Sequence, residues 1–323
     1  MRQVILACLP GVAILIAFFG LGVISNLIIA IVAGLAFEAW VLKLRGRPIA
    51  FYLKDYSAVL TAVLLAIAIP PFAPWWLIVV GLFFSIVVAK HLYGGLGYNP
   101  FNPAMVGYVV LLISFPTEMT QWAAPIGALQ INSDMPSLFN LPFAFQQVFT
   151  DGTLDAYSAA TPLDSLKQRG AMTLTELYQN DMTLHKGRWA GLGWEWVNVA
   201  FLTGGIYLLY KKVFTWHAPV AMLVAIAILS SLFYGSGGSE SHGSPLFHLL
   251  SGATMFGAFF IITDPVTSAV SRRGRLVYGA GIGVLIYVIR IWGNYPDAVA
   301  FACLLYTSPS PRDLSTSRMP SSA

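Results

Sequence analysis

Two copies of the pattern Ser-x-Ala-Thr place a threonine hydroxyl three residues after a serine. One copy is residues 158–161 in the stretch DAYSAATPLD, and the other is residues 251–254 in HLLSGATMFG. A threonine hydroxyl is a nucleophile that forms esters when a neighbouring base activates it. Each copy is therefore a candidate for covalent attachment of a phosphate-bearing group.

The copy at 158–161 has the more complete set of polar neighbours. Asp155 precedes Thr161 by six residues, Ser158 precedes it by three, and Ala160 is adjacent. The same positions before Thr254 hold a histidine and a serine, so the acid is missing there. The first copy also lies in a polar segment, where a soluble modifying enzyme could reach it.

Both copies also have ordinary structural interpretations. The residues after Thr161 could begin a helix that is capped by Asp164 or Ser165. Thr254 lies inside the apolar segment 246–263, where a helical threonine bonds to the preceding turn and small residues form a packing face. A phosphate at that depth would place an anion in hydrocarbon at high cost. The sequence therefore favours Thr161 over Thr254.

The composition indicates a membrane protein. Hydrophobic residues make up 57% of the chain and charged residues 10%, and the mean hydropathy is +0.72. Soluble domains carry about 25% charged residues. Cys8 and Cys303 are too few for a disulfide framework or a metal cluster, so no metal site is expected.

Apolar runs of membrane-spanning length recur along the chain. They predict an all-α polytopic bundle of about ten transmembrane helices. The expected spans are residues 3–19, 22–42, 57–72, 75–92, 104–115, 193–210, 217–235, 246–263 and 276–292, with a tenth from about 296.

The distribution of charge predicts the orientation of these spans. Most lysines and arginines fall on one side, which should be cytoplasmic: Arg2, Lys43, Arg45, Arg47, Lys54, Lys90, Lys211, Lys212, Arg272, Arg273 and Arg275. Residues 116–191 form the one large loop on the opposite side, and acidic residues outnumber basic ones in it. We expect this loop to face outward.

Two proline-containing stretches, GGLGYNPFNPAM at 94–105 and FIITDPVTSAV at 260–270, lie at predicted cytoplasmic span ends. Proline and glycine at such places are typical of broken or re-entrant helices whose ends face a ligand or an ion. Turns between ordinary helices are the alternative.

Together these motifs, in this order, resemble the D subunit of the Rnf electron-transport complex, which is related to the B subunit of the sodium-translocating NADH:quinone reductase. The resemblance covers residues 1–302 and rests on GGLGYNPFNPAM, DAYSAATPLD and HLLSGATMFGAFFIITDPVTS followed by SRRGR. The chain is expected to form a single transmembrane bundle over these residues.

The resemblance implies that FMN is joined through its phosphate to Thr161 by a separate flavin transferase that uses FAD. Asp155, Ser158 and Ala160 would be the recognition positions. Ala159 stands where the common form of the motif has glycine.

The resemblance also implies a second, non-covalent flavin, expected to be riboflavin. Asn99, Asn102 and Asp264 are the polar residues at the predicted helix breaks, so we place this flavin or an ion path near them. Alternatively, Asn102 and Asp264 only cap helices.

The expected function is that of a membrane subunit in a bacterial inner-membrane complex. It would pass electrons through bound flavin between partner subunits, coupled to Na⁺ or H⁺ transport, with residues 116–191 on the periplasmic side. Its partners would be the other subunits, the flavin transferase and the lipid bilayer, and no nucleic acid is expected. No residue of the chain is expected to be catalytic on its own. The alternative from another class is a solute channel or secondary transporter without a redox cofactor.

The composition changes abruptly at residue 303, in the middle of an apolar run. Back-translated, residues 303–313 resemble a sequencing adaptor. We therefore expect residues 303–323 to be a non-native tail that truncates the last span.

Overall fold

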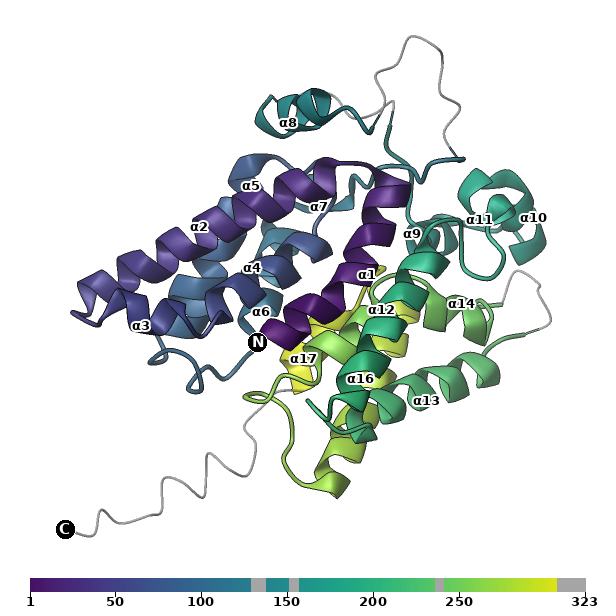
Figure 1. Cartoon of the computed structure of the whole chain (residues 1–323). Coiled ribbons are helices and arrows are strands. Elements are labelled where there is room, and N and C mark those ends of the chain that lie inside the picture. Colours follow the sequence, from purple (N-terminus) through teal and green to yellow (C-terminus); the bar gives the residue numbers. More distant parts are fainter. Residues whose placement is uncertain (129–137, 151–156, 236–240, 307–323) are drawn as a thin grey trace.

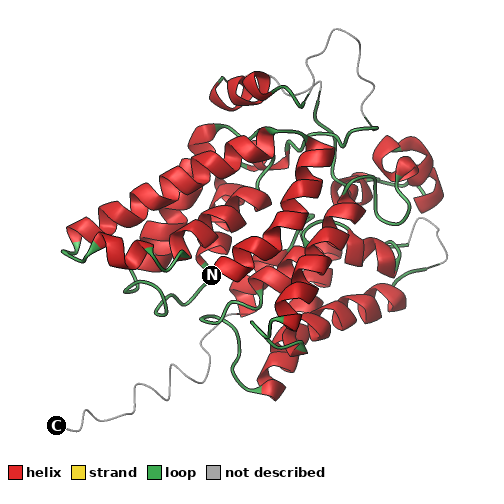
Figure 2. Cartoon of the chain, in the orientation of Figure 1, coloured by secondary structure: helices red, strands yellow, loops and turns green. Residues whose placement is uncertain are grey.

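The computed structural model describes residues 1–128, 138–150, 157–235 and 241–306. Within these residues the chain is helical, and an isolated antiparallel bridge between Ala123 and Ser158 is the one element of β pairing (Figure 2). The all-α prediction is confirmed for this part of the chain.

The helices before the large loop form an N-terminal group. Its members are α1 (Arg2–Phe19), α2 (Gly22–Leu44), α3 (Ile49–Leu53), α4 (Ser57–Ala68), α5 (Trp75–Leu82), the π-helix η1 (Phe83–His91) and α6 (Pro103–Ser114).

The helices after the loop form a C-terminal group. Its members are α12 (Trp194–Tyr210), α13 (His217–Leu232), α14 (Pro245–Leu250), α15 (Thr254–Phe256), the π-helix η2 (Gly257–Ile261), α16 (Arg272–Trp292) and α17 (Val299–Tyr306).

Short helices occupy the large loop. They are α7 (Pro116–Thr120), α8 (Leu141–Phe149), α9 (Pro162–Gln168), α10 (Leu174–Asn180) and α11 (Met182–Lys186). Figure 1 shows α8, α10 and α11 at the upper end of the molecule, with α3 and the N-terminus away from them. We call the end that carries residues 116–191 the loop end.

Three helices, α1, α2 and α16, are long and apolar enough to cross a membrane, judged by length and composition. Shorter apolar helices cover Ser57–Ala68, Trp75–His91, Pro103–Ser114 and His217–Leu232. Helices are thus found at the predicted spans, whereas the count of about ten crossings stays a prediction.

The two groups pack closely because small residues line the contacts between their helices. α1 lies against α12 (Figure 1), and a Cβ atom added to Gly204 would collide with the carbonyl oxygen of Ala7. Small residues at helix contacts allow this approach of backbones.

Basic side chains join several helix ends away from the loop end. Arg2 donates to the hydroxyl of Tyr56, and Arg45 donates to the carbonyl of His91. These bonds bring together the start of α1, the start of α4, the end of α2 and the end of η1. They agree with the predicted grouping of basic residues at one end.

Lys90 differs from the other members of that group because its side chain is buried. Its Nζ donates to both carboxylate oxygens of Glu38, at 2.8 and 2.9 Å, and to the hydroxyl of Ser57 at 2.8 Å. His91 Nε2 lies 3.0 Å from the same carboxylate. The charge of Lys90 is therefore neutralised inside the bundle, where a buried ammonium needs partners.

The span predicted at 246–263 is not a continuous helix, so the prediction that residues 251–254 sit within a helix is wrong. α14 ends at Leu250, the backbone turns through Gly252 with φ +56°, and α15 begins at Thr254. The left-handed φ of Gly252 suits glycine, and it creates a true break beside α9.

Candidate functional site

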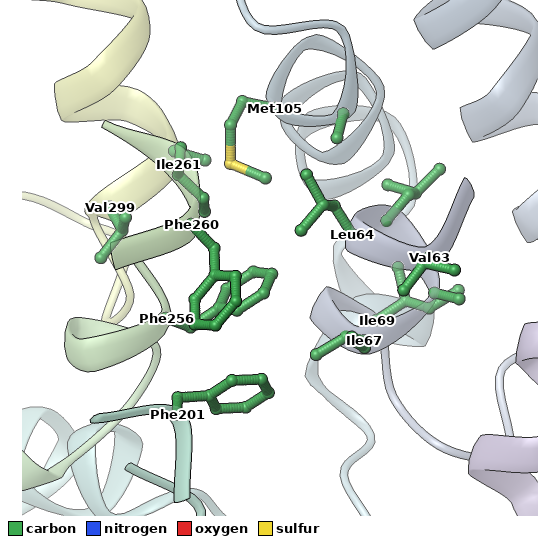
Figure 3. Packing of buried hydrophobic residues seen from close by; sticks show 14 of the residues in the cluster. Val63, Leu64, Ile67, Ile69, Met105, Phe201, Phe256, Phe260, Ile261 and Val299 are labelled. Atoms are coloured by element: carbon green, nitrogen blue, oxygen red, sulfur yellow. The ribbon is translucent and has the colours of Figure 1, made fainter. Parts of the chain in front are cut away.

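A cavity of about 280 Å³ lies where the N-terminal and C-terminal groups meet at the loop end. Its walls come from α1, α4 and α6, from α12 and α15, and from the loop segment around α7 and α9. Figure 3 shows the hydrophobic packing between the two groups, with Phe201, Phe256 and Phe260 facing Leu64 and Ile67. Ile67, Met105, Phe201 and Phe256 are among the residues labelled there that also line the cavity. The cavity thus joins segments that are far apart in the sequence.

Six aromatic residues contribute to the lining of the cavity. They are Tyr108, Trp122, Trp194, Phe201, Phe256 and Tyr295. The rings of Trp122 and Trp194 are 4.9 Å apart edge to face, and those of Phe201 and Phe256 are 5.0 Å apart. Such a surface suits a flat, apolar ring system held by stacking and edge contacts.

Thr161 reaches the cavity because a short stretch of β pairing fixes the backbone before it. The N–H of Ala159 donates to the carbonyl of Trp122 at 3.0 Å, and the N–H of Ala124 donates to the carbonyl of Tyr157 at 2.7 Å. Trp122 and Thr161 both line the cavity. The structure therefore places the predicted attachment residue in the cavity wall.

Thr161 itself is the N-cap of α9. Its Oγ1 donates to Oδ2 of Asp164 at 2.5 Å and accepts from the N–H of Asp164 at 3.3 Å. The expectation that Asp164 or Ser165 would cap this helix is wrong, because the threonine hydroxyl takes that role.

Asp164 lines the cavity beside Thr161. Burial raises the pKa of this carboxyl above its usual range, although the hydrogen bond from Thr161 acts in the opposite direction. A carboxyl with a raised pKa, in contact with a hydroxyl, is placed to exchange a proton with it.

The other motif positions have different surroundings. Ser158 takes part in the bridge to Ala123, and Ala160 is exposed next to Thr161. Asp155 lies outside the described residues.

The second copy of the motif lies on the same cavity, in the break between α14 and α15. Gly252 and Ala253 line it, and a Cβ at Gly252 would lie 2.6 Å from Cδ1 of Leu163 in α9. Thr254 is fully buried, and its hydroxyl donates to backbone carbonyls. The first copy was predicted in a polar loop and the second inside an apolar span, yet residues of both line the same cavity. Of the two threonines, Thr161 lines the cavity and Thr254 does not.

Asn198 of α12 satisfies the backbone groups freed by this break. Its Nδ2 donates to the carbonyls of Leu250 and Gly252, both at 2.9 Å, and its Oδ1 accepts from the N–H of Met255 at 3.0 Å. A broken helix in an apolar bundle needs such a partner.

Arg290 and Asp297 complete the wall behind the break. Arg290 Nη2 donates to the hydroxyl of Thr254 at 2.8 Å, and Asp297 Oδ2 accepts from the N–H of Ala253 at 3.1 Å. Asn198, Arg290 and Asp297 were not predicted from the sequence. The available signal was that each is a polar residue within or next to an apolar run.

The residues predicted to hold a second flavin make local hydrogen bonds. Asn102 caps α6 by accepting from the N–H of Ala104 at 3.0 Å, and Asn99 donates to the carbonyl of Phe101 at 2.9 Å. Asp264 accepts from the hydroxyl of Thr267 at 3.0 Å. None of the three lines the cavity at Thr161, so a second flavin near them stays a prediction.

Comparison with known proteins identifies the family of the chain. A sequence profile of the NQR2, RnfD, RnfE family matches residues 1–312. A protein of Cellvibrio japonicus described as the D subunit of an ion-translocating oxidoreductase complex is 55% identical over 312 residues, which is 96% of this chain and 86% of that protein. Proteins with the same description from Ectopseudomonas mendocina and Alcanivorax borkumensis are each 54% identical, over 96% of this chain and 87% and 88% of their own length. The chain therefore belongs to the NQR2, RnfD, RnfE family.

Proposed function

We propose that this chain is a membrane subunit of an ion-translocating oxidoreductase complex and carries FMN on Thr161 through a phosphoester. The observation that carries the proposal is the position of Thr161, which lines a cavity with six aromatic residues between the two helix groups. The descriptions of its relatives support the same role.

The residues around the cavity fit the ring of a flavin. Its volume of about 280 Å³ is just below the range for small-molecule sites, about 300–1,000 Å³. Six aromatic side chains can contact a flat ring, while Thr161, Asp164 and Asp297 supply polar groups at one side. When bound, the flavin supplies the electron-transfer chemistry, and the protein positions it.

For attachment, Thr161 Oγ1 would form a bond to the phosphorus on the riboflavin side of FAD, and the bond between that phosphorus and the bridging oxygen would break to release AMP. The hydroxyl proton must leave in this step. Asp164 Oδ2, 2.5 Å from Oγ1, is placed to accept it. The separate transferase would provide binding and activation of FAD.

The remaining parts of the proposal follow from the resemblance and the charge pattern. The chain would lie in the bacterial inner membrane with residues 116–191 on the periplasmic side. It would assemble with the other subunits of the complex, and its electron transfer would be coupled to movement of Na⁺ or H⁺. A non-covalent riboflavin near Asn99, Asn102 and Asp264 belongs to the same proposal.

Fluorescence of the denatured protein tests the attachment. The chain, produced together with a flavin transferase, should give a fluorescent band in a denaturing gel under ultraviolet light. Thr161→Asn should abolish the band but keep the cap of α9, because asparagine caps helices well and its amide cannot form the phosphoester. Peptide mass spectrometry should place the adduct on Thr161.

Two variants serve as matched controls. Thr120→Ala removes another threonine hydroxyl from the cavity lining, and Thr254→Ser keeps the hydroxyl that Arg290 contacts. Both should remain fluorescent. A dark band for the unmodified sequence, in cells where a known substrate of the transferase is labelled, would contradict the proposal and favour a channel or transporter without flavin.

A further inference from the structure

A buried arginine lies directly behind the broken helix of the cavity wall. The Arg290 side chain is 2% exposed, and its guanidinium donates to the carbonyl of His248 and to the hydroxyl of Thr254, each at 2.8 Å. Its Nε has no hydrogen-bond partner among the described residues. Both acceptors are neutral, so these bonds leave the positive charge uncompensated.

Asp297 is the one carboxylate that the described residues place within 4 Å of this guanidinium. Its Oδ1 lies 3.8 Å from Arg290 Nη2, which is longer than a direct hydrogen bond. The Asp297 side chain is 27% exposed and lines the same cavity as Thr161. The pair therefore runs from the protein interior, at Arg290, to the cavity surface, at Asp297.

Fixed charges at this place act on any group in the cavity whose charge changes. Reduction adds electrons to a flavin ring and makes it more negative unless protons follow. In a partly buried site, where the effective dielectric is well below that of water, a unit charge nearby shifts such an equilibrium appreciably. A positive charge favours the reduced flavin and a negative charge disfavours it.

We propose that Arg290 and Asp297 form a charge pair that sets the reduction potential of the flavin on Thr161, an inference that rests on the proposed function. Arg290 stabilises the reduced flavin, and Asp297 limits that effect. Both are positioning residues that act through their charge.

The effect of the Asp297 charge can be tested separately from the hydrogen bonds that Asp297 accepts. Asn198 makes most of the hydrogen bonds that hold the break, while Asp297 contributes acceptors to the N–H groups of Ala253 and Val299. Oδ2 of Asp297 accepts from Ala253 and Oδ1 accepts from Val299, so an asparagine at 297 keeps the shape and one of these two acceptors and removes the charge. Asp297→Asn is therefore a nearly isosteric test of the electrostatic role.

Potentiometric titration of the purified, flavin-loaded chain measures the effect. Asp297→Asn should shift the midpoint potential of the covalent flavin to more positive values. We expect about a tenfold change in the reduction equilibrium, or ~30 mV for a two-electron couple. Asp297→Glu keeps the charge and should titrate close to the unmodified sequence. Arg290→Gln should shift the potential in the opposite direction.

Glu176→Gln serves as the control, because it removes a carboxylate from the loop surface that does not line the cavity. It should leave the potential unchanged. A fully loaded Asp297→Asn protein with an unchanged potential would overturn the inference, as would equal shifts in the Asn and Glu variants at 297. Because these outcomes depend only on the two variants at 297, the test holds even when Arg290→Gln does not fold. Absence of the fluorescent adduct from the unmodified chain would instead overturn the proposed function, and the inference with it.

Discussion

The Thr161 hydroxyl caps α9 and is also the proposed site of flavin attachment, and a phosphoester can keep only part of the capping interaction. As the N-cap of α9 it donates to the Asp164 side chain and accepts from the Asp164 N–H. As a phosphoester it has no proton to donate, although the oxygen can still accept. Attachment of flavin would therefore leave Asp164 next to a phosphate, and a carboxyl with a raised pKa tolerates that neighbour better because its neutral form is accessible.

The raised pKa of Asp164 predicts how stability depends on pH. Because the pKa in the folded state lies above that in the unfolded state, the folded protein binds the proton more tightly. Its contribution to stability is fully present below the unfolded-state pKa and is lost as the pH rises through the folded-state value. In Asp164→Asn this fall should be absent, which melting temperatures measured across the acid range in detergent would show.

The pKa of Glu176 is shifted in the opposite direction to that of Asp164. Hydrogen bonds from the Thr173 N–H and hydroxyl lower the pKa of this carboxyl. Its contribution is present above the unfolded-state pKa and is lost as the pH falls through the folded-state value. If Asp164→Asn and Glu176→Gln changed the pH profile in the same direction, the assignment of Asp164 would be wrong.

At the scale of elements, the break between α14 and α15 is held by side chains from other segments, and Asn198 of α12 makes three of these hydrogen bonds. Asn198 provides donors for Leu250 and Gly252 and an acceptor for Met255. The Asn198 side chain is buried, so these bonds are made inside the bundle, where an unsatisfied backbone group is costly. The break is therefore a joint property of α12 and the α14–α15 segment.

Asn198→Ala should destabilise the protein strongly. It leaves two carbonyls and one N–H without these bonds, and each unsatisfied buried group costs about 1–3 kcal/mol, so the loss should be on the order of 3 kcal/mol or more. Denaturation in mixed micelles would measure it. Asn26 is a matched control, since it is also a buried asparagine on a helix but donates to one carbonyl, that of Pro70. Equal losses for Asn198→Ala and Asn26→Ala would contradict this account.

The helices were predictable from the sequence, but the break was not. Hydrophobic runs marked the positions of α1, α2, α12, α13 and α16, because helix formation in an apolar run is a local property. Gly252 and its small neighbours fit a helix equally well, and the groups that hold the break, Asn198 and Asp297, come from distant segments. The cap of α9 was assigned to the wrong residue for a local reason, because Thr161, Asp164 and Ser165 lie within five residues and each is of a type that can cap a helix.

At the scale of the whole molecule, the cavity unites both helix groups with the loop between them. Thr161 comes from the loop, Tyr108 from the N-terminal group and Phe256 from the C-terminal group. The spacing of the motif identified Thr161. No local sequence pattern could show that Tyr108 and Phe256 lie around it. The site thus exists only in the folded bundle.

Labelling with a membrane-impermeant thiol reagent tests the predicted orientation. Glu176 and Lys211 are exposed at the positions expected to lie on opposite sides of the membrane, and Cys8 and Cys303 are buried. In cells with a permeabilised outer membrane, Glu176→Cys should react readily. Lys211→Cys should react only after the inner membrane is opened. Labelling of both under the first condition, or of Lys211→Cys alone, would contradict the proposed orientation.

A Cβ atom at Gly252 would lie 2.6 Å from Cδ1 of Leu163, so that side chain would have to move, and the positive φ of 252 also disfavours any other residue. The loop and the helix break at 252 therefore pack closely against each other. We expect a chimera that takes residues 116–191 from another family member to keep the cavity only if the host chain has glycine at 252. Exchange of that loop between relatives would then be limited by a residue that lies outside the exchanged segment.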